Sequence, residues 1–261
     1  MADLAYQRSG EGPRAVVLLH GFLGSGRNLT SLARALSERH ADVSVFALDL
    51  TGHGSSPPLP VGADLGTLAA DVLATARRVA GGARMIVVGH SLGGRVALRA
   101  ALLEPTAIAH VTLLDISPSP LPPGGETVRV VEALLAAPDT ASDRNAFRAH
   151  FAAAGLPAAL TEWLLLNLAH EGDGYRWRID RAALARLQER TGREDVWAAV
   201  ERERTYTVKC VRGGRSPYVS EPDARRLSTA GCLVVTIPGA GHFLHTDRPA
   251  DVVAAVATDL G

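Results

Sequence analysis

The order of apolar segments along the chain constrains its fold more than any other feature of the sequence. Short, continuous apolar runs alternate with stretches whose apolar residues recur at helical spacing. The first four runs are Ala15–Leu19, Val43–Leu48, Met85–Val88 and Val111–Leu114. Short apolar strands separated by amphipathic helices are typical of a parallel sheet covered on both faces. The sequence therefore predicts an α/β fold with a mostly parallel central sheet flanked by helices.

Polar residues follow these runs at or near the points where the strands end. They are His20, Asp49, Ser91 and Asp115. Right-handed crossovers between parallel strands bring the carboxyl ends of the strands to one edge of the sheet. Ligands bind at that edge in open α/β sheets, so we expect the chemistry of this protein there.

The alternation of strands and helices breaks after Asp115. The segment 117–125 is rich in proline and glycine, which excludes a helix interior and indicates a linker. From Glu126 to about Arg190 the pattern is helical, with no convincing strand. The sequence therefore predicts a helical insertion at about 117–191, which would form a cap over the carboxyl edge of the sheet.

Strand and helix patterns resume beyond the insertion, with apolar runs at Tyr206–Val211 and Leu233–Ile237 and a final helix at Pro249–Leu260. The core is therefore expected in two parts on either side of the cap. The predicted boundaries are 1–116 for the first part of the core, 117–191 for the cap and 192–261 for the second part.

The composition excludes several classes of partner. The 27 basic and 27 acidic side chains balance, so no net charge attracts the chain to nucleic acid or to anionic lipid. No apolar run approaches the length of a membrane span, and no signal peptide is visible at the first residues. We therefore expect a cytoplasmic protein without nucleic-acid or membrane partners, while its oligomeric state is not indicated. Cys210 and Cys232 lie in apolar surroundings and are expected to be buried thiols, with a disulfide as the alternative if their strands are adjacent.

The segment Gly89-His90-Ser91-Leu92-Gly93 matches the G-x-S-x-G nucleophile elbow. It follows a predicted strand and opens a predicted helix, which is the context that this motif requires. A sharp turn of this kind strains the serine backbone and exposes its hydroxyl, and only glycine fits where neighbouring segments pass closely. We therefore predict that Ser91 is a nucleophile. The alternative is a serine that caps a helix after an ordinary tight turn.

Acyl transfer needs backbone donors that stabilise the oxyanion. One donor is expected from the N–H of Leu92, the residue after the nucleophile. The second is expected from the N–H of Phe22, in the loop that follows the first long strand.

A serine nucleophile also needs a general base. His242 lies directly after the last apolar run and before the final helix, which gives the serine-then-histidine order of this motif class. We therefore predict that His242 is the base. His245 could replace it only if the loop had a different register.

The acid that orients the base is less obvious, because Ser216 stands where an aspartate is usual after the next-to-last strand. Asp115 ends the strand after that of the nucleophile and is the favoured candidate, with Ser216 as an auxiliary hydrogen-bonding group. Glu221 and Asp223 stay open as alternatives, although acidic residues are favoured at a helix start in any case.

The insertion supplies apolar residues at helical spacing, which usually pack against their neighbours. Some of them are candidates for the lining of an acyl pocket. We single out Trp163 for this role, together with Tyr218, which follows Ser216 closely.

Several of these segments together resemble the α/β-hydrolase superfamily along nearly the whole chain. They are 18–25, 49–56, 89–94, 115–118, 212–219 and 239–242. A serine at the usual acid position, with an aspartate one strand earlier, is similar to the YbfF-type esterase branch and to the ABHD11-like proteins. This resemblance implies hydrolysis of carboxylic esters with short to medium acyl chains, a helical cap, an acid at Asp115 and no metal or organic cofactor.

Other functions stay open, since one fold and one set of residues serve many reactions. A thioesterase, a C–C bond hydrolase and a lyase are alternatives within the same chemistry. A non-catalytic ligand-binding protein on the same scaffold is a further alternative, against which the pair of Ser91 and His242 argues.

Overall fold

The structure is a computed structural model that describes all 261 residues. Its central sheet has seven strands in the order β1-β3-β2-β4-β5-β9-β10. Only β1 runs antiparallel to its neighbour, and all other pairs are parallel. This confirms the predicted α/β fold with a mostly parallel sheet. The strands are β1 (Tyr6–Ser9), β2 (Arg14–Leu19), β3 (Val43–Leu48), β4 (Met85–His90), β5 (Ile108–Leu114), β9 (Thr207–Gly213) and β10 (Leu233–Ile237).

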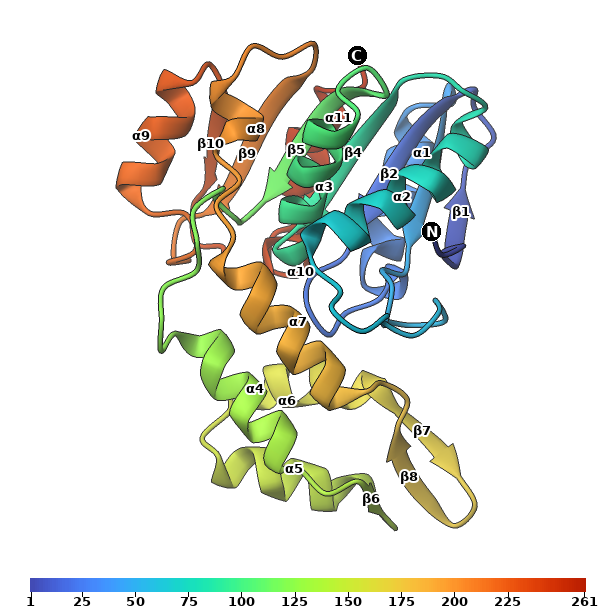
Figure 1. Ribbon diagram of the computed structural model, residues 1–261, viewed down its shortest axis with the longest axis vertical. Helices are drawn as coiled ribbons and strands as arrows, with labels where there is room; N and C mark the ends of the chain where they lie inside the picture. Colours follow the sequence, from blue (N-terminus) through green and yellow to red (C-terminus); the bar gives the residue numbers. More distant parts are fainter.

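Helices cover both faces of this sheet (Figure 1). One face carries α2 (Leu65–Ala80), α3 (Leu92–Leu103) and the short α8 (Ala198–Glu201), which pack on one another. The other face carries α1 (Thr30–Arg39), after the turn η1 (Gly26–Leu29), and α11 (Pro249–Ala257), after α10 (Leu244–Asp247). At the end of the sheet α9 (Glu221–Thr229) packs on β10.

The core is divided by the sheet into two hydrophobic clusters. Strand β2 shows the division, since Val17 and Leu19 belong to one cluster and Val16 and Leu18 to the other. Successive side chains of a strand point to opposite faces, so a strand buried on both faces must be apolar throughout. This explains why the central strands read as continuous apolar runs.

The chain leaves the core after β5 and returns before α8. The segment between them forms a separate layer beyond the carboxyl ends of the strands (Figure 1). It contains α4 (Glu126–Ala136), β6 (Thr140–Ala141), α5 (Arg144–Ala153), α6 (Ala158–Leu164), η2 (Leu165–Asn167), β7 (Leu168–Glu171), β8 (Gly174–Trp177) and α7 (Arg181–Arg193). We refer to residues 117–196 as the insertion with its two stalks, and to 126–193 as the cap layer.

The expectation that this segment contains no strand was wrong, because β6, β8 and β7 form a three-stranded antiparallel sheet. The pairs are short, and β7 and β8 pair through Glu171 and Gly174 across the two-residue turn Gly172-Asp173. A two-residue turn that contains glycine is a hairpin signal. The strands themselves are too short and too exposed to show an apolar alternation, so their pattern was not visible beside that of the helices.

The two stalks of the insertion are bound to each other and to the core. The Leu121 N–H donates to the Gly192 carbonyl at 2.8 Å, and the Val196 N–H donates to the Pro118 carbonyl at 3.1 Å. These bonds pair the outgoing chain with the returning chain, so the cap layer is joined to the core through one two-stranded connection.

Arg95 of α3 binds this connection to the core. Its guanidinium, on a side chain that is 2% exposed, donates to the carbonyls of Ser117 and Ser119 in the outgoing stalk. It also donates to the carbonyl of Thr191 near the end of α7 and to that of Glu194 in the returning stalk. Burial lowers the pKa of Arg95 to about 10, which leaves it charged at neutral pH. The helix that begins beside Ser91 therefore holds both ends of the insertion.

Two further observations concern the whole chain. Cys210 and Cys232 are buried free thiols, as expected, and the alternative of a disulfide is not realised. None of the helices combines the length and the apolar character that a membrane span requires.

Candidate active site

Ser91 occupies the turn between β4 and α3 and has a strained backbone, with φ of 51° and ψ of −118°. The turn requires glycine on both sides of the serine. A Cβ on Gly89 would lie 2.3 Å from the Gly93 carbonyl oxygen, and a Cβ on Gly93 would lie 2.4 Å from the Leu19 carbonyl oxygen. These approaches give the physical reason for the glycines of the G-x-S-x-G pattern, because any side chain there would force the turn open.

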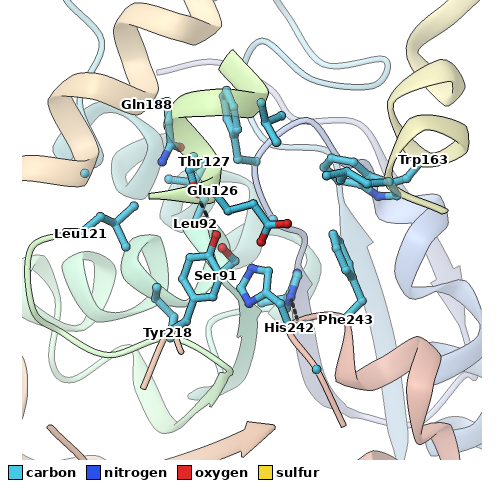
Figure 2. A pocket seen from close by; sticks show the side chains of 18 of the residues that line it. Ser91, Leu92, Leu121, Glu126, Thr127, Trp163, Gln188, Tyr218, His242 and Phe243 are labelled. Carbon is cyan, nitrogen blue, oxygen red and sulfur yellow. Dashed lines mark hydrogen bonds between the residues drawn. The ribbon is translucent and has the colours of Figure 1, made fainter. Parts of the chain in front are cut away.

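His242 follows β10 on a loop that brings it beside Ser91 (Figure 2). Its Nδ1 lies 2.8 Å from the Asp115 Oδ2, so Nδ1 carries the proton and donates to the carboxylate. The neutral ring then has its lone pair on Nε2. Asp115 is the one hydrogen-bond partner of the imidazole, and Ser91 is not bonded to it in this structure. Bonds between nucleophile and base are often long before a substrate binds.

Asp115 is fully buried and has a positive φ of 55°. Its carboxylate accepts three hydrogen bonds, from the Gly213 N–H at 2.8 Å, from the Ser216 hydroxyl and from His242. A buried carboxylate needs such donors in place of water. The sequence expectation that Ser216 would hydrogen-bond near the acid therefore matches the observed contact.

The two alternative acids lie on α9 and contact other groups. Glu221 pairs with Arg212 at 2.6 Å. Asp223 accepts hydrogen bonds from the hydroxyls of Ser117 and Ser119, each at 2.8 Å. Neither carboxylate contacts His242, so the geometry favours Asp115 as the acid.

Other histidines lie near His242 but do not bind the Asp115 carboxylate. His90 donates from Nε2 to the His242 carbonyl at 2.9 Å, and burial, with the neighbouring His245 and His242, lowers the pKa of His90 well below its usual value. Burial also lowers the pKa of His245 and that of His20 to about 4 each. The Nε2 of His20 accepts from the Leu50 N–H at 2.9 Å. His90 and His20 thus bind neighbouring loops through hydrogen bonds to the backbone.

The two predicted oxyanion donors lie at the same pocket. Leu92 is the first residue of α3, and its N–H donates to no protein acceptor. The N–H of Phe22 is also free of protein acceptors. The next residue, Leu23, has a positive φ of 60°, which makes the turn that carries Phe22 tight. Two unpaired donors beside Ser91 fit an oxyanion hole, and that role stays a prediction.

A pocket of about 730 Å³ opens above these groups, between the core and the cap layer. Trp163 of α6 and Phe243 form one wall, with ring centroids 5.5 Å apart, and Tyr218 forms another (Figure 2). Both aromatic residues singled out from the sequence, Trp163 and Tyr218, therefore line the pocket. The remaining apolar lining comes mainly from the insertion and includes Leu121, Val130 and Leu160.

The sequence reasoning missed Glu126, Thr127 and Gln188, which line the pocket from α4 and α7 (Figure 2). A signal for the first two was available, because they begin the first helix after the proline-rich linker. For Gln188 the sequence holds no such signal, since the side of α7 that faces the pocket depends on how the helices of the cap layer pack.

Comparisons with known proteins agree with this arrangement. A family model described as "Alpha/beta hydrolase family" matches residues 16–256. The mouse "sn-1-specific diacylglycerol lipase ABHD11" is 29% identical, over 94% of this chain and 80% of that protein. "Esterase YbfF" of Escherichia coli is 29% identical, over 92% of this chain and 91% of that protein. These similarities confirm the resemblance found in the sequence.

Among solved structures, a "Marine microorganism esterase" superposes with a TM-score of 0.87 at 23% identity, over 99% of each chain. A similarity at this level of identity concerns the fold. It covers the cap layer as well as the core, since the shared length is nearly the whole chain.

Proposed function

This chain belongs to the alpha/beta hydrolase family and is a carboxylic ester hydrolase. We propose that it works through an acyl-enzyme on Ser91. The observation that carries the proposal is the hydrogen bond of 2.8 Å between the Asp115 carboxylate and the Nδ1 of His242, beside the serine of a strained turn. This bond directs the lone pair of the base to the side of the ring away from Asp115.

In the first half of the reaction the Ser91 hydroxyl attacks the ester carbonyl carbon, and the Nε2 of His242 takes the hydroxyl proton. The carbonyl oxygen becomes an oxyanion that the N–H groups of Phe22 and Leu92 stabilise. The tetrahedral intermediate then breaks its bond to the alcohol oxygen, which receives the proton from His242. The products of this half are an alcohol and an acyl-enzyme.

In the second half, water attacks the acyl-enzyme while His242 takes a proton from the water. The second tetrahedral intermediate expels the Ser91 oxygen, which regains its proton from the imidazolium, and a carboxylic acid leaves. Asp115 acts in both halves, because its negative charge stabilises the imidazolium and its hydrogen bond keeps the ring in one tautomer. Ser216 holds the carboxylate in place for this role.

We further propose that the substrates are small carboxylic esters with short to medium acyl chains. A volume of about 730 Å³ lies in the range of pockets for small molecules, and the aromatic wall of Trp163 and Phe243 suits an apolar acyl group. A cytoplasmic location, without nucleic-acid or membrane partners, stays a prediction from the sequence. Thioester, C–C bond and lyase chemistry would use the same residues, so a substrate panel distinguishes them.

The test is the variant Ser91→Ala, assayed on p-nitrophenyl esters of increasing acyl length beside a matched thioester. Loss of the nucleophile is expected to lower kcat/KM by about 10³-fold or more, while circular dichroism shows a retained fold. Ser228→Ala is the matched control, since the Ser228 hydroxyl bonds within α9 and is remote from the pocket. A fluorophosphonate should label the wild-type protein at Ser91 alone. A protein that stays unlabelled and hydrolyses no ester would be a binding protein on the same scaffold.

A further inference from the structure

Tyr218 lies directly against the imidazole of His242. The two ring centroids are 3.9 Å apart, and the planes differ by 22°, which is a stacked arrangement. Tyr218 belongs to the loop between β9 and α9, which also carries Ser216, and its own N–H donates to the Ser216 hydroxyl at 3.3 Å. Ser216 thus connects the acid to the stacked ring, because its hydroxyl donates to Asp115 and accepts from the Tyr218 N–H.

The stack restrains a motion that the bond to Asp115 leaves free. The bond from Nδ1 to Asp115 fixes one atom of the ring, but the imidazole can still tilt about that bond. A flat ring 3.9 Å away covers one face of the imidazole and opposes the tilt. The position of Nε2 relative to the Ser91 hydroxyl depends on this tilt, and an error of about 1 Å at such a position costs on the order of a hundredfold in rate.

The hydroxyl of Tyr218 connects the same ring to the cap layer. It lies 2.9 Å from the hydroxyl of Thr127, in the first turn of α4 (Figure 2). Burial raises the pKa of Tyr218, so the phenol stays neutral, and either of the two hydroxyls can donate in the bond to Thr127. Since α4 is the first helix of the cap layer, the orientation of the cap is linked through one side chain to the orientation of the base.

We propose that Tyr218 is a positioning residue that holds the imidazole of His242 in its working orientation, and that Thr127 extends this control to the cap layer. The proposal rests on the function proposed above, because a working orientation is defined by the reaction of Ser91. It predicts that the ring and the hydroxyl of Tyr218 contribute separately, the ring through the stack and the hydroxyl through the cap.

The kinetic test compares Tyr218→Leu, which removes the aromatic ring, with Tyr218→Phe, which keeps the ring and removes the hydroxyl. Tyr218→Leu is expected to lower kcat on p-nitrophenyl acetate by about ten- to a hundredfold, with KM changed less than about threefold. Tyr218→Phe should recover most of this loss and stay within about two- to tenfold of the wild type. Where Tyr218→Leu fails to fold, Tyr218→Met replaces it, because a flexible apolar chain fills irregular space more readily.

The link to the cap is tested by Thr127→Val and by the double variant with Tyr218→Phe. Thr127→Val should match Tyr218→Phe, and the double variant should lose no more than either single variant, since all three remove one hydrogen bond. Losses that multiply in the double variant would show that Thr127 acts independently of Tyr218 and would overturn the cap link.

A proton NMR measurement follows the same ring without an ester. The Nδ1 proton of His242, bonded to a carboxylate, is expected as a downfield signal in the wild type and is assigned by its loss in His242→Gln. This signal should broaden or vanish in Tyr218→Leu and persist in Tyr218→Phe. A sharp signal together with a kcat within twofold of the wild type in Tyr218→Leu would refute the positioning role. Failure of the wild type to hydrolyse any ester would instead refute the proposed function, and the NMR comparison would still decide how the ring is held.

Discussion

Asp115→Asn separates the charge of the acid from its shape. Asp115 has a positive φ of 55°, which asparagine tolerates better than most residues, so the substitution should add little backbone strain. The variant keeps the volume of the side chain but replaces one carboxylate oxygen by an NH₂ group. The question is which oxygen is replaced, because the Asp115 Oδ1 accepts from the Gly213 N–H and its Oδ2 accepts from Ser216 and His242.

Each orientation of the new amide has a cost. One is unfavourable in energy, and the other places the proton of His242 on the wrong nitrogen. With its NH₂ group toward Gly213, two donors face each other in a fully buried place, at a cost of about 1–3 kcal/mol. The opposite orientation avoids this clash but aims the NH₂ group at His242, so Nδ1 must become the acceptor and the proton moves to Nε2. An Nε2 that carries a proton cannot take one from Ser91.

The magnitude follows from these two terms. The productive tautomer is disfavoured by about 1–3 kcal/mol, which makes it roughly five- to 150-fold rarer. The loss of the negative charge beside the imidazolium lowers the rate further, and together the expected loss in kcat is about 10³–10⁴-fold.

The assay is ester hydrolysis at saturating p-nitrophenyl acetate, with the fold monitored by thermal unfolding. Asp223→Asn and Glu221→Gln are the matched controls, because they make the same change in carboxylates that do not contact His242. Each control should stay within about threefold of the wild type. Should Asp115→Asn keep more than a tenth of the activity, or should a control lose more than Asp115→Asn does, the acid would lie elsewhere.

Two further predictions concern the stability of the fold. Arg95→Met should speed amide hydrogen exchange in residues 126–193 and lower the free energy of unfolding by about 3 kcal/mol, since four carbonyls at the two ends of the insertion lose their donor. Arg99→Met is its control, because Arg99 contacts only the carboxylate of one stalk residue, and equal exchange in both variants would contradict the role of Arg95. Asp259→Asn should lower the free energy of unfolding by about 3 kcal/mol at pH 7 by leaving the buried Lys209 without its anion. Burial opposes ionisation of Asp259, but hydrogen bonds, foremost from His110, outweigh it and lower its pKa in the folded protein. The stabilisation is therefore present above the unfolded-state pKa and lost as pH falls through the folded-state value. The difference between variant and wild type in urea unfolding should shrink below about pH 4, and a difference that grew there would disprove this account.

The main sheet and the residues proposed for the chemistry could both be predicted from the sequence. The apolar runs of the central strands are continuous because those strands are buried on both faces. This pattern was therefore sufficient to predict the parallel sheet. Ser91 was recognisable because its strained turn admits only glycine at the neighbouring positions, and sterics of this kind leave a local mark in the sequence. The order of strands along the chain then predicted that Asp115, Ser91 and His242 would meet at one edge.

Tertiary structure alone decided which groups touch the base. The strand order favoured Asp115 but left Glu221 and Asp223 open, because the contact of Asp115 with His242 joins residues 127 positions apart. No local sequence pattern predicts the stack of Tyr218 on His242 or the hydrogen bond between Tyr218 and Thr127. The same is true of the four carbonyls that Arg95 binds. The same holds for the small sheet of the cap layer, whose strands are too short to carry a period. Local sequence records the constraints that a residue meets within its own turn or strand, whereas contacts between distant segments depend on packing that no single segment contains.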